Sequence, residues 1–119
     1  NLHARYLIND ACVKLGKPFV YGSICEFCGQ VSVFNYQNGP TYRDLFEYND
    51  EIENFSQPLG VIGALPGIVG SLQANEAIKI ILENPGVLSG KLLTIDILNN
   101  TYLTFAIQKK ERGEESLFK

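Results

Sequence analysis

Cys25 and Cys28 form the one Cys-x-x-Cys motif in the chain. Two thiols at this spacing are typical of zinc ligands or of a dithiol that cycles with a disulfide. A tetrahedral zinc site needs four ligands, and the chain offers only Cys12 and His3 beside this pair. Redox motifs of this kind usually begin a helix, whereas this one lies between two predicted strands. Incidental thiols are therefore the favoured interpretation, and zinc or redox chemistry is the alternative.

Other chemically capable side chains stand alone in the sequence. His3 is the sole histidine, and no second member of a catalytic triad is visible, so an exposed helix residue is favoured over a catalytic base. Asp96 lies in an otherwise apolar strand and needs a partner if it is buried, which favours a hydrogen-bonded sheet residue. Glu76 and Lys79 are three apart on a predicted helix, which predicts an ordinary surface ion pair.

A glycine-rich apolar segment over 60–70 runs directly into a predicted helix. Pro66 suits the first turn, because its missing N–H costs nothing there. Small residues at a 4-3-4-3 spacing share one helix face: Gly63, Gly67, Gly70, Ala74 and Ala77. Another element can approach this stripe closely, and both a second copy of the chain and the chain's own sheet are candidates. A phosphate cradle is disfavoured, because no strand precedes the glycines and no GKS or GKT triplet occurs.

Length and composition limit the function classes. With 119 residues the chain is one domain or part of one, and 45% apolar with 11% aromatic residues is ordinary globular composition. A net charge of −3 argues against nucleic-acid binding, and the broken apolar run over 59–72 is too short for a membrane span. Three cysteines and no leader pattern at residue 1 favour reduced thiols in the cytoplasm. The absence of an initiator methionine predicts a fragment or a processed or engineered product.

These residues must be positioned by a mixture of helices and strands. Residues 2–15 read as a helix with an apolar stripe that ends at Gly16 and Pro18; the stripe contains Ala4, Ile8, Ala11, Cys12 and Leu15. Residues 19–24 are nearly continuously apolar, which is typical of a parallel strand covered on both faces. A second strand is predicted over 29–36. Residues 41–59 are irregular and acidic, with a single helical turn near 42–46.

The second half of the chain continues with a helix over 66–83 and strands over 91–98 and 101–108. Asn99 and Asn100 predict a two-residue hairpin turn between these strands. The predicted class is α/β, an α+β fragment with one parallel-type strand plus antiparallel strands packed with two main helices. Residues 1–108 form the domain, and the charged tail over 109–119 is predicted to be flexible.

Several sequence blocks, in this order and spacing, carry a family resemblance. They cover residues 5–12, 17–24, 29–34, 39–46 and 65–79. Over residues 1–107 the chain resembles the C-terminal half of MoeB/ThiF-type adenylyltransferases, relatives of the ubiquitin-activating enzymes. The resemblance implies the C-terminal half of a Rossmann-like activating-enzyme fold.

In such enzymes the C-terminal glycine of a ubiquitin-like sulfur-carrier protein is activated. The carrier carboxylate attacks the α-phosphate of Mg-ATP, which gives an acyl-adenylate and pyrophosphate, and a thiocarboxylate follows for molybdopterin or thiamine biosynthesis. The resemblance implies ATP and Mg in the parent enzyme, a homodimer, and this carrier as the partner. The glycine-rich nucleotide-binding half would precede residue 1, so we expect the isolated chain to lack catalytic residues and activity.

The family motif D-N-x-x-x-R-x-x-x-N matches Asn1, Arg5 and Asn9, which the resemblance places beside the nucleotide. The metal-associated aspartate would precede Asn1, which also suits a plain helix N-cap. Ligands of open α/β sheets gather at the carboxyl ends of strands. We therefore expect Gly22 and Ser23 to line the site of the carrier tail, together with Ser56 in the following loop.

The chain also departs from the family pattern. Asp44 and Glu47 stand where many members have a zinc-binding Cys-x-x-Cys pair, and the tail has no cysteine, so we expect no zinc. Ser56 replaces a cysteine often found in that loop, which argues against a thioester or persulfide there. Cys28 replaces a frequent glutamate. The rival hypotheses are a non-catalytic dimerising interaction module and, third, a thiol protein that uses Cys25 and Cys28.

Overall fold

The computed structural model describes residues 2–46 and 63–110 of the chain. In chain order the elements are α1 (Leu2–Leu15), β1 (Phe19–Cys25), β2 (Cys28–Phe34), α2 (Tyr42–Leu45), α4 (Ala64–Ile81), β3 (Lys91–Asp96) and β4 (Thr101–Ala106). The predicted order of helices and strands is confirmed. None of the helices in these ranges is long and apolar enough to cross a bilayer.

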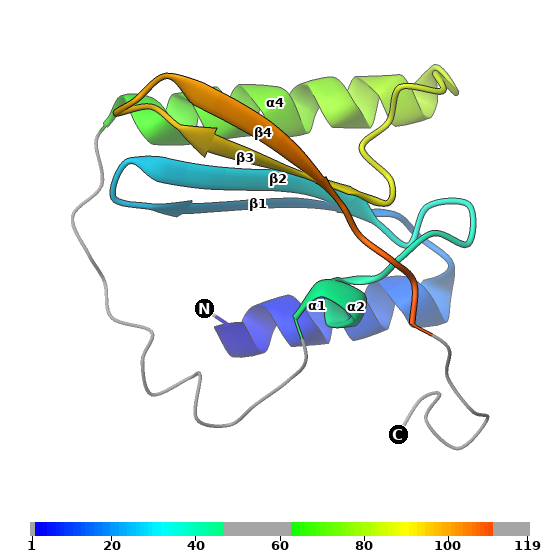
Figure 1. Cartoon of the computed structure of the whole chain (residues 1–119). Coiled ribbons are helices and arrows are strands. Elements are labelled where there is room, and N and C mark those ends of the chain that lie inside the picture. The colour runs from blue at the N-terminus through cyan, green and yellow to red at the C-terminus, as the bar shows by residue number, and fades with distance from the viewer. Residues whose placement is uncertain (1, 47–62, 111–119) are drawn as a thin grey trace.

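The four strands form one antiparallel sheet in the order β1-β2-β3-β4. The helix α4 covers one face of this sheet, and α1 and α2 lie on the opposite side (Figure 1). Successive side chains of a strand point to opposite faces, so each strand contributes to both layers. The core is correspondingly divided. The cluster on the α1 side contains Tyr6, Tyr21, Phe34, Tyr42, Leu92 and Ile107, and the cluster on the α4 side contains Val31, Leu65, Val69 and Ile95.

The strand β1 is covered on both faces as predicted, but the predicted parallel pairing is not found in the described residues. β1 pairs antiparallel with β2, from Phe19 opposite Phe34 to Cys25 opposite Cys28. Its apolar residues are explained by helices on both faces of the sheet: Tyr21 packs in the α1-side cluster, and Gly22 faces Gln73 of α4. Burial on both faces therefore does not by itself identify a parallel strand.

The predicted apolar stripe of α1 is wrong. Ile8 is 48% exposed and Leu15 is 69% exposed, whereas Tyr6 and Asn9 are buried, with Asn9 only 1% exposed. A polar side chain faces inward here because its hydrogen bonds are satisfied by α2, which offsets the cost of desolvation. The predicted helix stop is confirmed: Gly16 has a φ of +66°, and the N–H of residue 17 donates to the Cys12 carbonyl at 2.9 Å.

The helix α4 buries Leu65, Val69 and Glu76 and holds Pro66 in its first turn. The small-residue stripe does not pack on the sheet. A Cβ atom built on Gly63, Gly67 or Gly70 meets nothing within 4 Å, and Ala74 is exposed while Ala77 is half-buried. Packing of the stripe against the chain's own sheet is therefore excluded for these glycines, and the stripe faces away from it.

Glu76 is not the surface residue that its spacing to Lys79 predicted. Its carboxylate is 2% exposed, accepts the N–H of Leu88 at 2.7 Å and accepts a hydrogen bond from the Lys79 ammonium at 2.7 Å. Lys79 also donates to the carbonyl of Gly86 at 3.3 Å. The pair thus fixes the loop between α4 and β3, because a buried carboxylate is stable only with such partners.

The connection between β3 and β4 is longer than the predicted two-residue turn. Asp96 and Thr101 are the last paired residues, so four residues, 97–100, form the loop. The Asp96 carboxylate accepts the N–H groups of Leu98 and Asn99 at 3.0 and 3.2 Å and the Asn99 side-chain amide at 2.8 Å. These hydrogen bonds, those from Asn99 foremost, lower the pKa of Asp96. The prediction of a hydrogen-bonded sheet residue is confirmed.

Candidate functional site

A polar group lies on the α1-side face of the sheet near the carboxyl end of β1. Ser23 stands directly opposite Gln30 of β2, so both side chains share a face with Tyr21, two residues earlier. The Tyr21 hydroxyl donates to Oε1 of Gln30 at 3.0 Å. The hairpin register therefore brings together three side chains that can donate or accept hydrogen bonds.

Arg5 of α1 supplies a positive charge to this group. Its Cζ atom lies 5.8 Å from the centroid of the Tyr21 ring, within the range of a cation–π contact. Arg5 is half-buried as a residue, and no carboxylate in the described ranges forms an ion pair with it. Since arginine keeps its charge at any relevant pH and presents a planar set of donors, the position suits a carboxylate or a phosphate.

The two buried phenols beside Arg5 remain neutral donors. Burial raises the pKa of Tyr21, and the Ser23 hydroxyl and the Arg5 charge oppose part of that shift. Burial also raises the pKa of Tyr42, which Arg5 opposes through a hydrogen bond. Tyr42 lies against Tyr21 with ring centroids 5.3 Å apart. The site thus combines one permanent cation with neutral hydroxyl groups.

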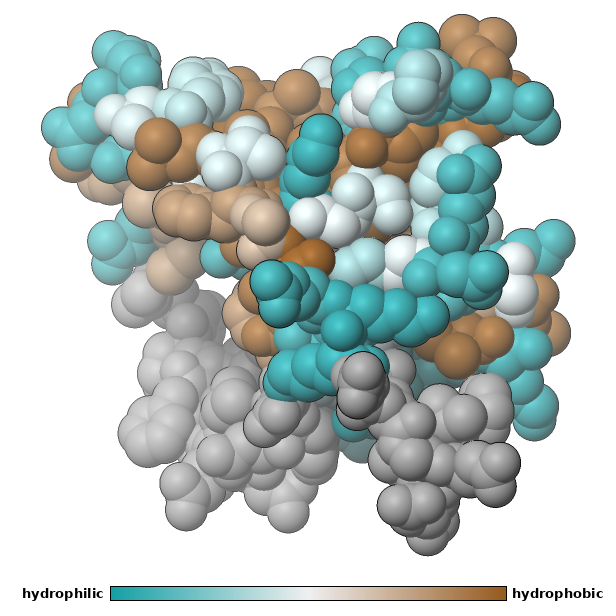
Figure 2. Space-filling model, turned by 45° about the vertical axis from the view of Figure 1, so that its right-hand side comes forward, coloured by the Kyte–Doolittle hydropathy of each residue, from teal (hydrophilic) through white to brown (hydrophobic). Residues whose placement is uncertain are grey.

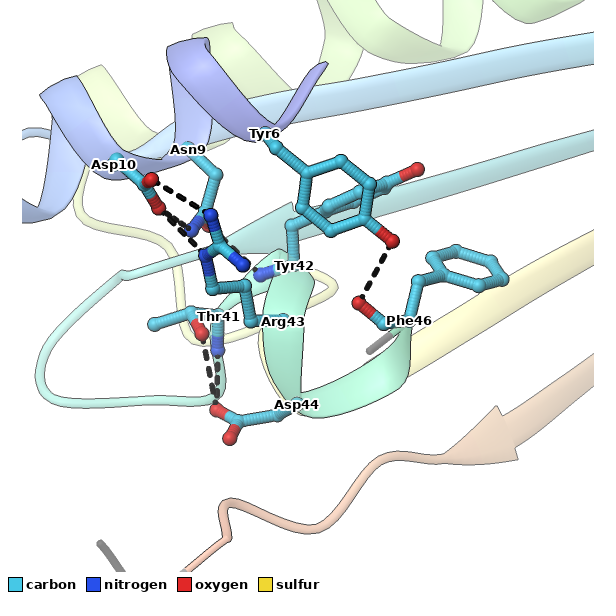
Figure 3. A network of polar contacts seen from close by, with 8 residues as sticks. All are labelled: Tyr6, Asn9, Asp10, Thr41, Tyr42, Arg43, Asp44 and Phe46. Atoms are coloured by element: carbon cyan, nitrogen blue, oxygen red, sulfur yellow. Dashed lines mark hydrogen bonds and ion pairs between the residues drawn. The ribbon is translucent and has the colours of Figure 1, made fainter. Parts of the chain in front are cut away.

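A network between α1 and α2 positions Tyr42 (Figure 3). The backbone N–H of Tyr42 donates to Oδ1 of Asn9 at 2.9 Å, and the Asn9 amide donates to Asp10 at 3.2 Å. Arg43 donates to both carboxylate oxygens of Asp10, each at 2.8 Å. Such a two-point pair fixes orientation as well as distance. Asn9, which the resemblance placed beside the nucleotide, is in the described structure a buried anchor for α2.

Two further contacts complete the anchoring of α2. The Tyr6 hydroxyl donates to the carbonyl of Phe46 at 3.0 Å, and the Arg43 guanidinium lies 4.9 Å from the centroid of the Tyr6 ring. At the start of the helix, Asp44 accepts the N–H of Thr41 at 2.7 Å in a capping box. The short helix therefore enters the cluster in one orientation.

Asp44, which stands where many family members have a zinc-binding cysteine, has a structural role in this chain. Its second carboxylate oxygen accepts the N–H of Lys110 at 3.2 Å, so both oxygens are engaged in backbone contacts. Among residues 2–46 and 63–110, no group of three or more histidine, cysteine, aspartate or glutamate side chains is arranged to hold a metal ion. The expectation of no zinc stays a prediction for the whole chain.

The other predicted site residues separate. Gly22 faces α4, and a Cβ atom built on it would lie 2.3 Å from Cδ of Gln73, so this glycine serves helix packing. Ser23 faces the opposite side and joins Arg5. Asn1 and Ser56 lie outside the described residues.

Three members of the site were not predicted from the sequence: Tyr21, Gln30 and Tyr42. A hairpin with a two-residue turn at 26–27 could have identified the first two. Such a turn sets Cys25 opposite Cys28, and two residues further along it sets Ser23 opposite Gln30, on the same face as Tyr21. Tyr42 depends on its bond to Asn9, 33 residues away, for which no local pattern exists.

Comparisons with known proteins agree with this fold. The model of the ThiF family matches residues 1–116, and the chain belongs to this family. A probable molybdopterin-synthase adenylyltransferase of Pyropia yezoensis is 48% identical over 110 residues, which cover 90% of this chain and 29% of that protein. The adenylyltransferase and sulfurtransferase MOCS3 of Dictyostelium discoideum is 45% identical over 116 residues, covering 95% of this chain and 27% of that protein. The chain thus spans under a third of the length of either relative.

Solved structures of the enzyme MccB share the fold. The complex of MccB with N-formylated MccA superposes with a TM-score of 0.78 at 11% identity and covers 95% of this chain and 37% of that one. The complex of E. coli MccB with ATP gives a TM-score of 0.75, again at 11% identity, over 95% of this chain and 35% of that one. At this identity the likeness establishes the fold alone, and the predicted activating-enzyme fold is confirmed.

Proposed function

We propose that this chain belongs to an ATP-dependent adenylyltransferase that activates the C-terminal glycine of a ubiquitin-like sulfur-carrier protein. The observation that carries the proposal is the guanidinium of the half-buried residue Arg5, held against Tyr21 on the same face as Ser23 and Gln30. The names of the relatives as adenylyltransferases support the reaction class. The relatives named for molybdopterin synthase favour a carrier of the molybdopterin type.

The chemistry requires two anions to meet. A carboxylate oxygen of the carrier attacks the α-phosphorus of ATP, a bond to the carboxylate forms, and pyrophosphate leaves with the electron pair of the broken P–O bond. A fixed cation lowers the repulsion between the carboxylate and the phosphates and stabilises the charge that develops on them. Arg5 is positioned for this role, while the Tyr21 hydroxyl and the side chains of Ser23 and Gln30 can bind peptide groups of the tail.

The sheet also offers a path for the tail. Ser23, Gln30, Thr94 and Leu103 are successive cross-strand neighbours, so they form one row across all four strands on the α1-side face. Strands lie about 4.8 Å apart, which makes the row about 14 Å long, or about four extended residues. The tail in this proposal follows the row from β4 to Arg5.

The body of the carrier would dock at the β4 end of that row. Leu103 and Phe105 share the α1-side face and are half exposed, as is Tyr102 on the other face. Figure 2 shows apolar side chains reaching the surface in the upper part of the molecule, where Figure 1 draws α4 and β4. Exposed apolar residues on a strand at the end of a sheet are typical of a protein-binding surface.

In this proposal ATP is a reactant and Mg²⁺ its cofactor, and we expect groups other than Arg5 that bind them to come from the glycine-rich half that the resemblance implies. Asp10 is already paired with Arg43, and residues 2–46 and 63–110 hold no acidic cluster that fits a divalent cation. We therefore assign no step to a metal held by this part of the chain. We expect the parent enzyme to act in the cytoplasm and the 119-residue chain alone to show no ATP–pyrophosphate exchange.

We also propose that the outward stripe of α4 is a contact between two copies of the chain. The stripe is open in the described structure and continues at helical spacing into Ile78 and Ile81, which are both exposed. Small residues permit close approach of a second helix, and the isoleucines supply apolar area. Sedimentation should give a dimer that Ala74→Glu disrupts, whereas a monomer at every concentration would contradict this contact.

The carrier proposal is tested by calorimetric titration of the 119-residue chain with a molybdopterin-type sulfur carrier, intact or lacking its C-terminal Gly-Gly. Removal of a charge-assisted hydrogen bond costs at least about 1.5 kcal/mol, or about tenfold in Kd. We expect Arg5→Gln to weaken binding of the intact carrier about tenfold and to leave the shortened carrier unaffected. Lys14→Gln, which removes an exposed charge from the same helix, is the control.

The rival function predicts another pattern. A non-catalytic dimerising interaction module would bind through the apolar residues of β4 and would be insensitive both to Arg5→Gln and to the Gly-Gly tail. Equal affinity of the chain for the intact and the shortened carrier would therefore overturn the proposed tail site.

A further inference from the structure

Cys25 and Cys28 face each other across the hairpin that joins β1 and β2. They are the last residue pair before the turn, and only Glu26 and Phe27 separate them. Glu26 has a φ of +53°, which allows the chain to reverse within these two residues. Directly opposed residues of antiparallel strands point to the same face, so the two thiols share one side of the sheet.

The backbone spacing of such a pair suits a covalent link. Opposed Cα atoms in an antiparallel ladder are about 4.5 to 5.5 Å apart, and disulfides span Cα distances of about 4.4 to 6.8 Å. Both cysteines are free and exposed, so a disulfide in solution can reach them. A link at this position keeps the register; it requires only that the two Cβ atoms, about 5 Å apart in such a pair, move to the roughly 4 Å of a disulfide.

We propose that Cys25 and Cys28 are a redox-active dithiol that closes into a cross-strand disulfide by exchange with a low-molecular-weight disulfide such as glutathione disulfide. One cysteine thiolate attacks a sulfur of glutathione disulfide, which forms a mixed disulfide and releases one glutathione thiolate. The second cysteine thiolate then attacks the protein sulfur of the mixed disulfide and releases the second glutathione. The protein loses two protons and two electrons, and glutathione disulfide is reduced.

Proximity is the feature that drives this reaction. Both cysteines lie at strand ends that a two-residue turn joins, so neither has to move far to reach the other. The second step is intramolecular, and the second thiol therefore competes efficiently with free glutathione. The pair is set by the hairpin alone, and the inference does not depend on the proposed adenylyltransferase function.

Cys12 provides an internal comparison. It lies on α1, is half-buried, and burial raises its pKa, so its thiolate is less available than that of an exposed cysteine. It is the single cysteine of α1, so this helix offers it no partner for a disulfide. We therefore expect Cys12 to remain a free thiol under conditions in which the pair is oxidised.

The test equilibrates the 119-residue chain with defined ratios of reduced glutathione and glutathione disulfide, followed by acid quench, alkylation and intact mass measurement. The expected product carries one alkyl group, and without that group its mass is two hydrogens below that of the fully reduced chain. Peptide mapping should assign the alkylated thiol to Cys12. Cys25→Ser and Cys28→Ser should each accumulate a single glutathionyl adduct at the remaining cysteine of the pair. Cys12→Ser should still lose two hydrogens and leave no free thiol.

Quantitatively, the wild-type chain should reach half oxidation with at least tenfold less glutathione disulfide than Cys25→Ser needs for half glutathionylation. Comparable ratios for the two proteins, one glutathionyl group on each cysteine of the pair, or disulfide-linked dimers in place of the lighter monomer would each overturn the proposal. Circular dichroism of the serine variants checks that they keep the fold.

Discussion

Asn9→Ala removes the contact that fixes the start of α2 against α1. Tyr42 is the first residue of α2, so its N–H has no partner inside the helix and donates to Oδ1 of Asn9 at 2.9 Å instead. Both residues are buried. A buried donor left unpaired costs about 1 to 3 kcal/mol, and the higher helix propensity of alanine recovers about 0.5 kcal/mol. We expect a net loss of about 1.5 kcal/mol in the free energy of unfolding.

Urea denaturation followed by circular dichroism measures this loss, and thermal melting should show a midpoint lower by about 10 °C. The matched control is Asn75→Ala, the same substitution at an exposed position of α4, which we expect to change stability by less than about 0.5 kcal/mol. Equal stability changes for the two variants would refute the reasoning, because they would mean that the N–H of Tyr42 finds another partner at no cost.

Two further predictions concern packing and charge. Gly29→Ala puts a Cβ atom 2.7 Å from Cγ2 of Val69, a short buried side chain that cannot swing aside, and should lower the free energy of unfolding by about 1 to 3 kcal/mol, whereas Gly67→Ala meets nothing within 4 Å and should raise it by about 0.5 to 1 kcal/mol. Urea titrations of both variants, which must differ in sign, check this pair. The hydrogen bond from Arg43 lowers the pKa of Asp10 below 3.8, so the pair stabilises the fold above that pH and the contribution disappears as the pH falls through the lowered pKa. Asp10→Asn should therefore flatten the acid limb of the stability profile by no more than about 1 kcal/mol, since the pair is half exposed, and an unchanged limb would contradict the assigned ion pair.

Local sequence patterns were sufficient to predict most elements but not the direction in which they face. The glycine at the end of α1, the proline in the first turn of α4 and the apolar strand segments gave element positions within a few residues of those observed. The predicted buried face of α1 was wrong because Asn9 is buried through a hydrogen bond to Tyr42, and apolar periodicity carries no information on such a bond. The β3–β4 turn was wrong because Asp96 binds two backbone N–H groups and thereby favours a longer loop.

The candidate site was predictable to the extent that it follows from family resemblance and strand ends. Arg5 came from a motif, and Ser23 came from the rule that ligands gather at the carboxyl ends of strands. Gly22 was grouped with Ser23 because the two are neighbours in sequence, although neighbours on a strand face opposite sides of the sheet. Tyr42 depends on a contact between distant segments, which a single sequence does not reveal.

The alternation along β1 accounts for the way in which one short strand serves both packing and chemistry. Gly22 faces α4, where the end of the flexible Gln73 side chain occupies the space beside its Cα atom. Tyr21, Ser23 and Cys25 face the other side, where the strand meets Arg5 and the cysteine pair. A shift of register by one residue would exchange these sets, placing the tyrosine under α4 and the glycine beside Arg5. The burial of Tyr21 in the α1-side cluster, where it is 2% exposed, therefore fixes the register on which both the proposed tail site and the proposed dithiol depend.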